Sequence, residues 1–155
     1  MSIDIFHIGL SALVFLKKEA AMDSERFTRG WERLGEIDGE AGKHVIDSLA
    51  QICPDLGRYI VEFGFGDVYS RPGLTLRERE IATIAALAAM GTAAPQLAVH
   101  IKAGINVGLT REEIMEVIIQ MALYAGFPAS LNAAFTAASV FEQTEPYGRN
   151  EGGEG

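Results

Sequence analysis

The sequence is poor in cysteine and in basic side chains. It holds one cysteine, Cys53, which cannot form an internal disulfide, a CxxC redox pair or a cysteine-rich zinc site. A single thiol fits a reducing, cytoplasmic setting. The 13 Lys and Arg against 21 Asp and Glu give a net charge of -8. This balance argues against nucleic acid and against an anionic membrane surface as partners.

No apolar run in the sequence is long enough to cross a membrane. The N-terminal candidate for a targeting sequence is Ile3–Leu16, which is too short because a spanning helix needs about 20 apolar residues. Asp4 and His7 interrupt this run, and two lysines follow it, although a secretory signal places its positive charge before the apolar segment. We therefore expect residues 1–21 to be an N-terminal extension, either an extra helix or disordered.

Period-2 strand patterns are missing as well, and the apolar residues recur at helical spacing over most of the chain. The 48% apolar content is enough to bury a core. The sequence predicts a single all-α domain over residues 22–143 and a polar, glycine-rich, disordered tail over residues 144–155. Two capping boxes, Thr75–Glu78 and Thr110–Glu113, mark helix starts.

Several of the expected helices are apolar over much of their circumference. Gly64 and Gly66 are expected to end the helix that begins at Pro54, and Gly126 to end the one after Thr110. Two inward stripes are predicted, one in each half of the chain: Leu56, Tyr59, Ile60 and Phe63, and then Leu131, Phe135 and Ala138. In a small monomer, the apolar side chains outside these stripes would be exposed to solvent. We therefore expect other copies of the chain to bury them in an oligomer.

The sequence contains no phosphate-binding glycine loop and no metal-binding spacing such as HExxH. The candidates for chemistry are therefore polar residues on apolar helical faces. His100 has Gln96 one turn before it and small residues one turn after it. This face could hold a ligand beside a group that moves protons near neutral pH. The alternative is a core histidine bonded to a backbone carbonyl.

Glu80 is the second candidate, since a carboxylate beside a core stripe is costly unless it is paired. It could act with His100 as a proton relay, or it could be a structural carboxylate paired with Arg77 one turn away. Further arginines lie nearby in the sequence, and arginine recognises carboxylates bidentately. The candidate substrate-binding residues are Arg71, Arg77, Arg79, Gln96 and Tyr124.

Two long runs carry a family resemblance. LTLREREIATIAALAAMG (Leu74–Gly91) and QLAVHIKAGINVGLTREEIMEVIIQMALYAGFPASLNA (Gln96–Ala133) resemble the carboxymuconolactone decarboxylase family. The upstream run Pro54–Leu74 is similar to its decarboxylase branch, and the likeness covers about residues 23–143. It implies an alkyl-hydroperoxidase-D-like helical bundle and a homo-oligomer, usually a hexamer built as a trimer of dimers.

The resemblance also implies roles for the two candidates. Glu80 and His100 match the relay positions of a thiol-peroxidase branch, with one extra residue between them. The two cysteines of that branch would fall near Ala93 and Gln96, and neither is cysteine. Because disulfide exchange needs two thiols, peroxidase activity through Cys53 is the weaker alternative.

The decarboxylase branch is expected to act on 4-carboxymuconolactone without metal or organic cofactor. The lactone carbonyl accepts the electrons that CO2 leaves behind, so the protein has to bind carboxylates, stabilise negative charge and deliver a proton. Residues 54–111 carry 6 basic and 5 acidic side chains, so the overall acidity does not exclude a small carboxylate substrate. A third hypothesis is a non-catalytic helical oligomer, in which Glu80 and His100 pair with the backbone.

Overall fold

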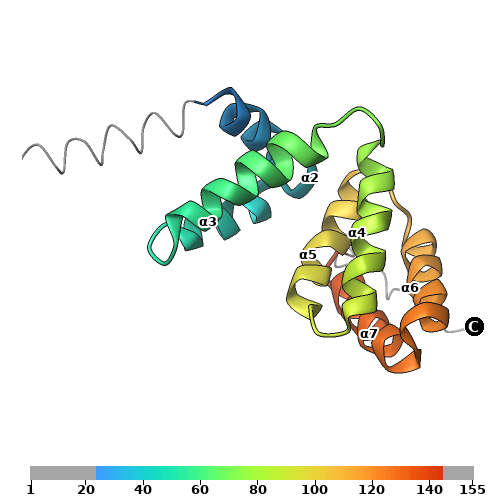
Figure 1. Ribbon diagram of the computed structural model, residues 1–155. Coiled ribbons are helices and arrows are strands. Elements are labelled where there is room, and N and C mark those ends of the chain that lie inside the picture. The colour runs from blue at the N-terminus through green and yellow to red at the C-terminus, as the bar shows by residue number, and fades with distance from the viewer. Residues whose placement is uncertain (1–23, 145–155) are drawn as a thin grey trace, which may run out of the picture. The chain divides into compact units, whose positions relative to one another are not determined.

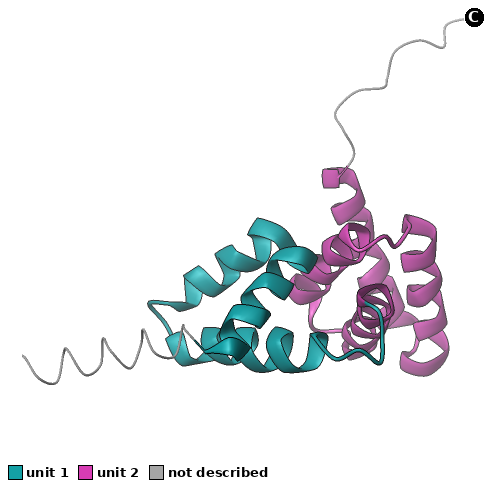
Figure 2. Ribbon diagram, turned by 90° about the horizontal axis from the view of Figure 1, so that it is seen from above, with its two compact units in different colours: residues 1–75 teal, residues 76–155 magenta. Residues whose placement is uncertain are grey.

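The fold was analysed in a computed structural model that describes residues 24–144. The described residues are helices joined by short turns, with no strand among them, so the all-α prediction is confirmed. They divide into two compact units, one ending at Thr75 and the other beginning at Leu76 (Figure 2). The predicted extension 1–21 and residues 145–155 of the predicted tail lie outside the described residues. The single-domain boundary 22–143 stays a prediction.

The first unit pairs a long helix, α2 (Glu25–Leu49), with a second helical rod (Figure 1). Ser24 caps α2, because its hydroxyl accepts the backbone N–H of Phe27 at 3.1 Å. Gly39 breaks the α2 geometry with φ 58° and ψ -140°, a conformation that glycine reaches without a Cβ penalty. The α2 chain therefore consists of two helical segments joined at this glycine.

The second rod starts as α3 (Pro54–Tyr59) and continues as a π-helix, η1 (Ile60–Tyr69). The prediction that Gly64 and Gly66 end this helix is wrong, because it runs on to Tyr69. Gly66 serves close packing instead: a Cβ there would lie 2.4 Å from the Arg26 carbonyl oxygen on α2. The two backbones approach too closely for any side chain at this point.

The predicted inward stripe of this rod is also wrong. Leu56, Tyr59 and Phe63 are exposed, while the buried side is formed by Val61, Phe65 and neighbouring small residues. The physical reason is the close approach of α2 and η1, which brings small residues and backbone into contact and turns the larger side chains outward.

The second unit is a bundle of four helices: α4 (Leu76–Met90), α5 (Ala94–Asn106), α6 (Arg111–Ala125) and α7 (Phe127–Thr144). Each of α5, α6 and α7 packs against α4, and α7 also packs against α5 and α6 (Figure 1). The turns use glycines with positive φ, among them Gly91 and Gly126, so Gly126 ends α6 as predicted. The core is aliphatic and consists largely of Ile84, Leu97, Ile101, Ile114, Ile118, Ala137 and Val140.

Two further expectations about this unit have different outcomes. The capping box at Thr110 is confirmed, since the Thr110 hydroxyl accepts the Glu113 N–H at 3.1 Å and Glu113 accepts the Thr110 N–H at 2.9 Å. The predicted inward stripe of α7 is wrong. Leu131, Phe135 and Ala138 are exposed, and α7 buries Ala129, Ser130, Ala133, Ala137 and Val140 instead. Within residues 24–144, no helix has both the length and the apolarity to cross a membrane.

Candidate active site

Glu80 lies in the second turn of α4 and is buried in the core of the second unit. It stands one turn before Ile84 on α4, and both side chains have 0% exposure. Residues at i and i+4 share a helix face, so the apolar face that buries Ile84 carries Glu80 into the core with it. A fully buried carboxylate is costly unless it finds donors, so its contacts decide what it can do.

His100 reaches the same place from α5. Its neighbour in the chain, Ile101, is fully buried in the core, which fixes how α5 faces the bundle. The His100 side chain itself keeps 21% exposure. It therefore sits at the margin of the core, where one side of the ring meets the protein and the ring still has access to solvent.

The two side chains meet. His100 Nδ1 lies 3.0 Å from Glu80 Oε2, within hydrogen-bond distance. When Glu80 is ionised it only accepts hydrogen bonds, and His100 Nδ1 is then the donor. Nε2 is the nitrogen on the other side of the ring, and the contact with a buried carboxylate fixes the orientation of the imidazole.

The second carboxylate oxygen of Glu80 is in a different situation from Oε2. Oε1 is buried, and within the described part of the chain no hydrogen-bond partner reaches it. Buried polar atoms are nearly always satisfied, and leaving one without a donor costs about 1–3 kcal/mol. An arrangement that costs stability in this way is typical of functional sites rather than of structural pairs.

The non-catalytic hypothesis predicted that Glu80 and His100 would pair with the backbone, whereas Glu80 contacts the His100 ring. The alternative pairing of Glu80 with Arg77 is also wrong. Arg77 forms an ion pair with Glu113 on α6, and its Nε donates to the Gly108 carbonyl at 3.4 Å. The arginine is held by the turn before α6, so it is not available to neutralise Glu80.

The remaining predicted residues lie in different surroundings. Arg79 is half-buried on α4, and Gln96 is exposed in the first turns of α5, one turn before His100. Tyr124 is exposed near the end of α6. Arg71 belongs to the loop that precedes Thr75, in the first unit. Among the predicted site residues, the structure thus records a direct contact for Glu80 and His100.

A shallow depression opens on the second unit between the ends of α4, α5 and α7. It is lined mainly by small and apolar residues, with Asn132 and Thr136 as its polar members. Glu80 and His100 do not line it. A closed pocket around the pair therefore stays a prediction. Within residues 24–144, no group of three or more histidine, cysteine or acidic side chains is arranged to hold a metal ion.

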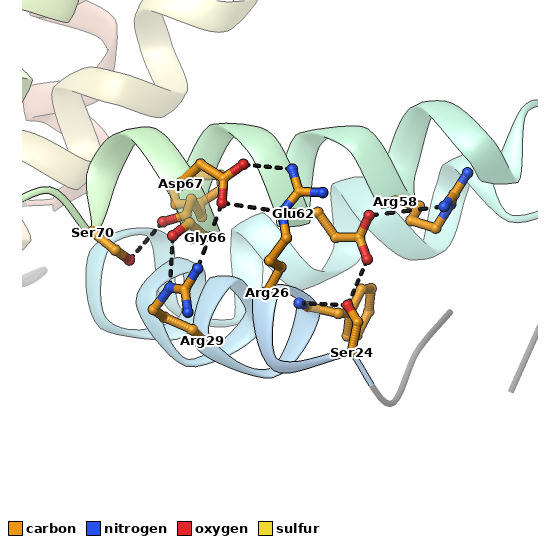
Figure 3. Close-up of polar contacts among 10 residues, drawn as sticks. Ser24, Arg26, Arg29, Arg58, Glu62, Gly66, Asp67 and Ser70 are labelled. Atoms are coloured by element: carbon orange, nitrogen blue, oxygen red, sulfur yellow. Dashed lines mark hydrogen bonds and ion pairs between the residues drawn. The ribbon is translucent and has the colours of Figure 1, made fainter. Parts of the chain in front are cut away.

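Besides Glu80 in the second unit, a glutamate is buried in the first unit: Glu62 on η1, which the sequence analysis missed. Ser24 donates to its Oε1 at 2.6 Å, and Arg58 lies 3.8 Å from its Oε2 (Figure 3). Both of its oxygens therefore have partners, whereas Oε1 of Glu80 has none within the described residues. The detectable sequence feature is a lone carboxylate inside an otherwise apolar run, Ile60–Phe65.

A neighbouring ion-pair group completes the link between α2 and η1. Asp67 binds both Arg26 and Arg29, and Arg29 also donates to the Gly66 carbonyl at 2.8 Å (Figure 3). Hydrogen bonding from Arg26 holds the pKa of Asp67 below its usual range. These side chains satisfy one another across the two elements, which is the pattern of a structural network. Glu80 and His100 remain the candidate active site.

Comparison with known proteins gives consistent matches. A sequence model of the carboxymuconolactone decarboxylase family matches residues 54–139. A 4-carboxymuconolactone decarboxylase of Acinetobacter baylyi is 39% identical over 123 residues, which cover 77% of this chain and 90% of that protein. An uncharacterised 15.0 kDa protein of Paracoccus denitrificans is 31% identical over 63% of this chain and 74% of its own length. A nitrosuccinic acid decarboxylase of Metarhizium robertsii is 34% identical over 48% of this chain and 51% of its own length.

Proposed function

The chain belongs to the carboxymuconolactone decarboxylase family and is a decarboxylase, and we propose that it acts on a small carboxylated lactone of the 4-carboxymuconolactone type or on a related keto acid. The observation that carries the mechanism is the contact of His100 Nδ1 with a fully buried Glu80 at 3.0 Å. Both relatives with a named activity are decarboxylases of small carboxylic acids, one a lactone and one a nitro acid.

The substrate itself supplies the electron sink. When the carbon–carboxylate bond breaks, CO2 leaves and the bonding electron pair moves into the conjugated lactone carbonyl, which becomes a dienolate. The protein has to stabilise negative charge on that oxygen and then return one proton to carbon. His100 does both in the proposed mechanism, first as a cationic hydrogen-bond donor through Nε2 and then as the proton donor.

Glu80 prepares His100 for this role. By accepting from Nδ1, the carboxylate holds the ring so that Nε2 faces away from the core, and its negative charge favours the imidazolium. Each turnover consumes one proton. The ring keeps 21% exposure, so water can return that proton to Nε2 after the product has formed.

Substrate carboxylates need cationic partners. The proposal assigns this task to Arg79 on α4, with Gln96 and Tyr124 as hydrogen-bond donors. Arginine suits the task because its planar fork binds a carboxylate through two parallel hydrogen bonds. Substitution of a true carboxylate-binding arginine should raise KM much more than it lowers kcat.

The test is turnover of 4-carboxymuconolactone by the purified protein, followed by the loss of the substrate's ultraviolet absorbance. We expect His100→Ala to lower kcat by a factor of about 10² or more, the usual contribution of a general acid. His44→Ala is the matched control, because His44 is exposed on α2, and it should retain full activity. Absence of turnover would refute the lactone substrate, and full activity of His100→Ala would refute the role of His100.

We further propose that the protein is a homo-oligomer, a hexamer built as a trimer of dimers. Phe127, Leu131 and Phe135 recur every four residues on α7, and the first and last are 74% and 70% exposed. They belong to the segment 117–141, which contains no charged side chain. Large exposed apolar surface without charge is typical of an interface between copies of one chain.

Light scattering tests this assembly. Phe135→Asp places a charge on the α7 surface and should lower the measured mass to that of a smaller species. His44→Asp places the same charge on α2 and should leave the mass unchanged. A wild-type mass equal to that of one chain would refute the proposal.

A further inference from the structure

Arg77 takes part in a small polar cluster at one end of the four-helix unit. Its guanidinium binds the Glu113 carboxylate and donates through Nε to the Gly108 carbonyl at 3.4 Å. Glu113 in turn accepts the Thr110 backbone N–H at 2.9 Å. The cluster thus joins the first turn of α4 to the turn that links α5 with α6.

The cluster lies next to the candidate active site along both helices that form it. Arg77 stands one turn before Glu80 on α4, and Gly108 follows α5, the helix of His100. The two helices run antiparallel and also meet where a Cβ on Gly104 would lie 3.1 Å from Ile84 Cδ1. Ile84 and Gly104 each stand one turn after a member of the pair.

We infer that Arg77 is a positioning residue for the Glu80–His100 pair and that it does not bind the substrate. The Arg77–Gly108 contact, with Glu113 holding the guanidinium from α6, and the Ile84–Gly104 contact act as two fixed points along α4, one on each side of Glu80. Between them the axial position of α4 relative to α5 is set, and with it the 3.0 Å distance between His100 Nδ1 and Glu80 Oε2. The inference deepens the proposed function, since it names what holds the proposed relay in place.

Two features of the contact favour positioning over stability. The Arg77 and Glu113 side chains are 42% and 40% exposed, and ion pairs at such exposure contribute little to the free energy of unfolding. Yet Arg77 binds two acceptors, Gly108 in the turn before α6 and Glu113 in the first turn of α6, and a planar guanidinium holds such a pair of acceptors in fixed geometry. The contact therefore defines a distance between elements rather than adding much stability.

The experiment compares Arg77→Met with Arg111→Met. Arg111 is a matched control, because it lies in the first turn of its helix, α6, as Arg77 lies in the first turn of α4, and it too donates to a backbone carbonyl, that of Phe141, at 3.2 Å. The first readout is the proton NMR signal of the imidazole N–H held by Glu80, assigned by its loss in His100→Gln. The second is kcat and KM on 4-carboxymuconolactone, and the third is the urea midpoint.

We expect Arg77→Met to broaden or abolish the imidazole signal and to lower kcat by roughly tenfold to a hundredfold, as small misplacements of catalytic groups do. KM and the urea midpoint should change little, and Arg111→Met should match the wild type in all three. Arg77→Lys, which keeps the charge but loses the fork, should recover part of kcat. Glu113→Gln keeps an acceptor for the Thr110 N–H and should reproduce the Arg77→Met result if that variant does not fold.

Two results would overturn the inference. A rise in KM with kcat unchanged would assign Arg77 to the substrate, as the sequence predicted. An unchanged imidazole signal in both Arg77→Met and Glu113→Gln would show that the contact does not position the pair. The NMR readout needs no turnover, so it decides the positioning role even if the lactone substrate proves wrong.

Discussion

Replacement of Glu80 by methionine should make the protein more stable and inactive at the same time. Glu80 is fully buried in the four-helix unit, and its Oε1 has no hydrogen-bond partner within residues 24–144. Methionine has a similar length, a similar helix propensity and enough flexibility to fill the space of the carboxylate. The substitution therefore removes a buried polar group while it preserves the packing around it.

The size of the effect follows from two opposing contributions. Removal of the unsatisfied oxygen relieves about 1–3 kcal/mol. His100 loses its acceptor, but its ring is 21% exposed and water can replace part of that bond, which leaves a cost of about 1 kcal/mol. The difference predicts that Glu80→Met raises the free energy of unfolding by about 0–2 kcal/mol.

Urea denaturation measures this change, with Glu80→Gln as the comparison. Glutamine keeps an acceptor for His100 Nδ1 and retains a polar group in the core, so it should gain less stability than methionine. Both variants should lose decarboxylase activity, because neither supplies a negative charge beside the imidazole. A loss of several kcal/mol in Glu80→Met together with retained activity would show that Glu80 is a structural residue.

Three further predictions concern the two units separately. A Cβ at Gly30 would lie 2.0 Å from a carbonyl oxygen of η1, so Gly30→Ala should lower the free energy of unfolding, measured in urea, by about 1–3 kcal/mol. A Cβ at Gly35 on the same helix meets only ordinary contacts, so Gly35→Ala should raise the free energy of unfolding slightly. Hydrogen bonding from the Thr110 N–H and then from Arg77 lowers the pKa of Glu113. The stability it contributes should be complete above the ordinary value of 4.5 and lost as the pH falls through the lowered pKa, and Glu113→Gln should remove this part of the acid dependence measured by urea midpoints. Ser130 donates to a buried carbonyl of α6 at 2.9 Å, so Ser130→Ala should cost about 1 kcal/mol in thermal or urea unfolding, while a change at exposed Ser139 should cost less.

The local features of the second unit were predictable because they depend on neighbours in the sequence. Gly126 ends a helix in a backbone conformation with φ 88°, and the Thr110 capping box forms between residues three positions apart. Each is a short-range interaction with few alternatives. The same holds for the all-α class, since helical spacing of apolar residues is visible without knowledge of the partners.

The apolar stripes were mispredicted for the opposite reason. Phe63 and Phe135 have the hydrophobicity expected of core residues, yet both are exposed while glycine or alanine faces the neighbouring helix. The size and hydrophobicity of the side chains show that a helix has apolar faces. Which apolar face packs against another helix of the same chain depends on how closely the two backbones approach each other. That distance is a property of both helices together, so the sequence of one helix does not show it.

Sequence by itself determined that the chain is helical, where its second unit turns, and that a carboxylate and an imidazole lie on two of its helices. Tertiary structure alone decided what those polar groups touch. Arg77, one turn from Glu80, binds Glu113 thirty-six residues away, while Glu80 binds His100 twenty residues away. Within one helix, the spacing in the sequence decides which side chains can meet. Contacts between helices follow from the packing of the whole unit, so the sequence of a single segment cannot show them.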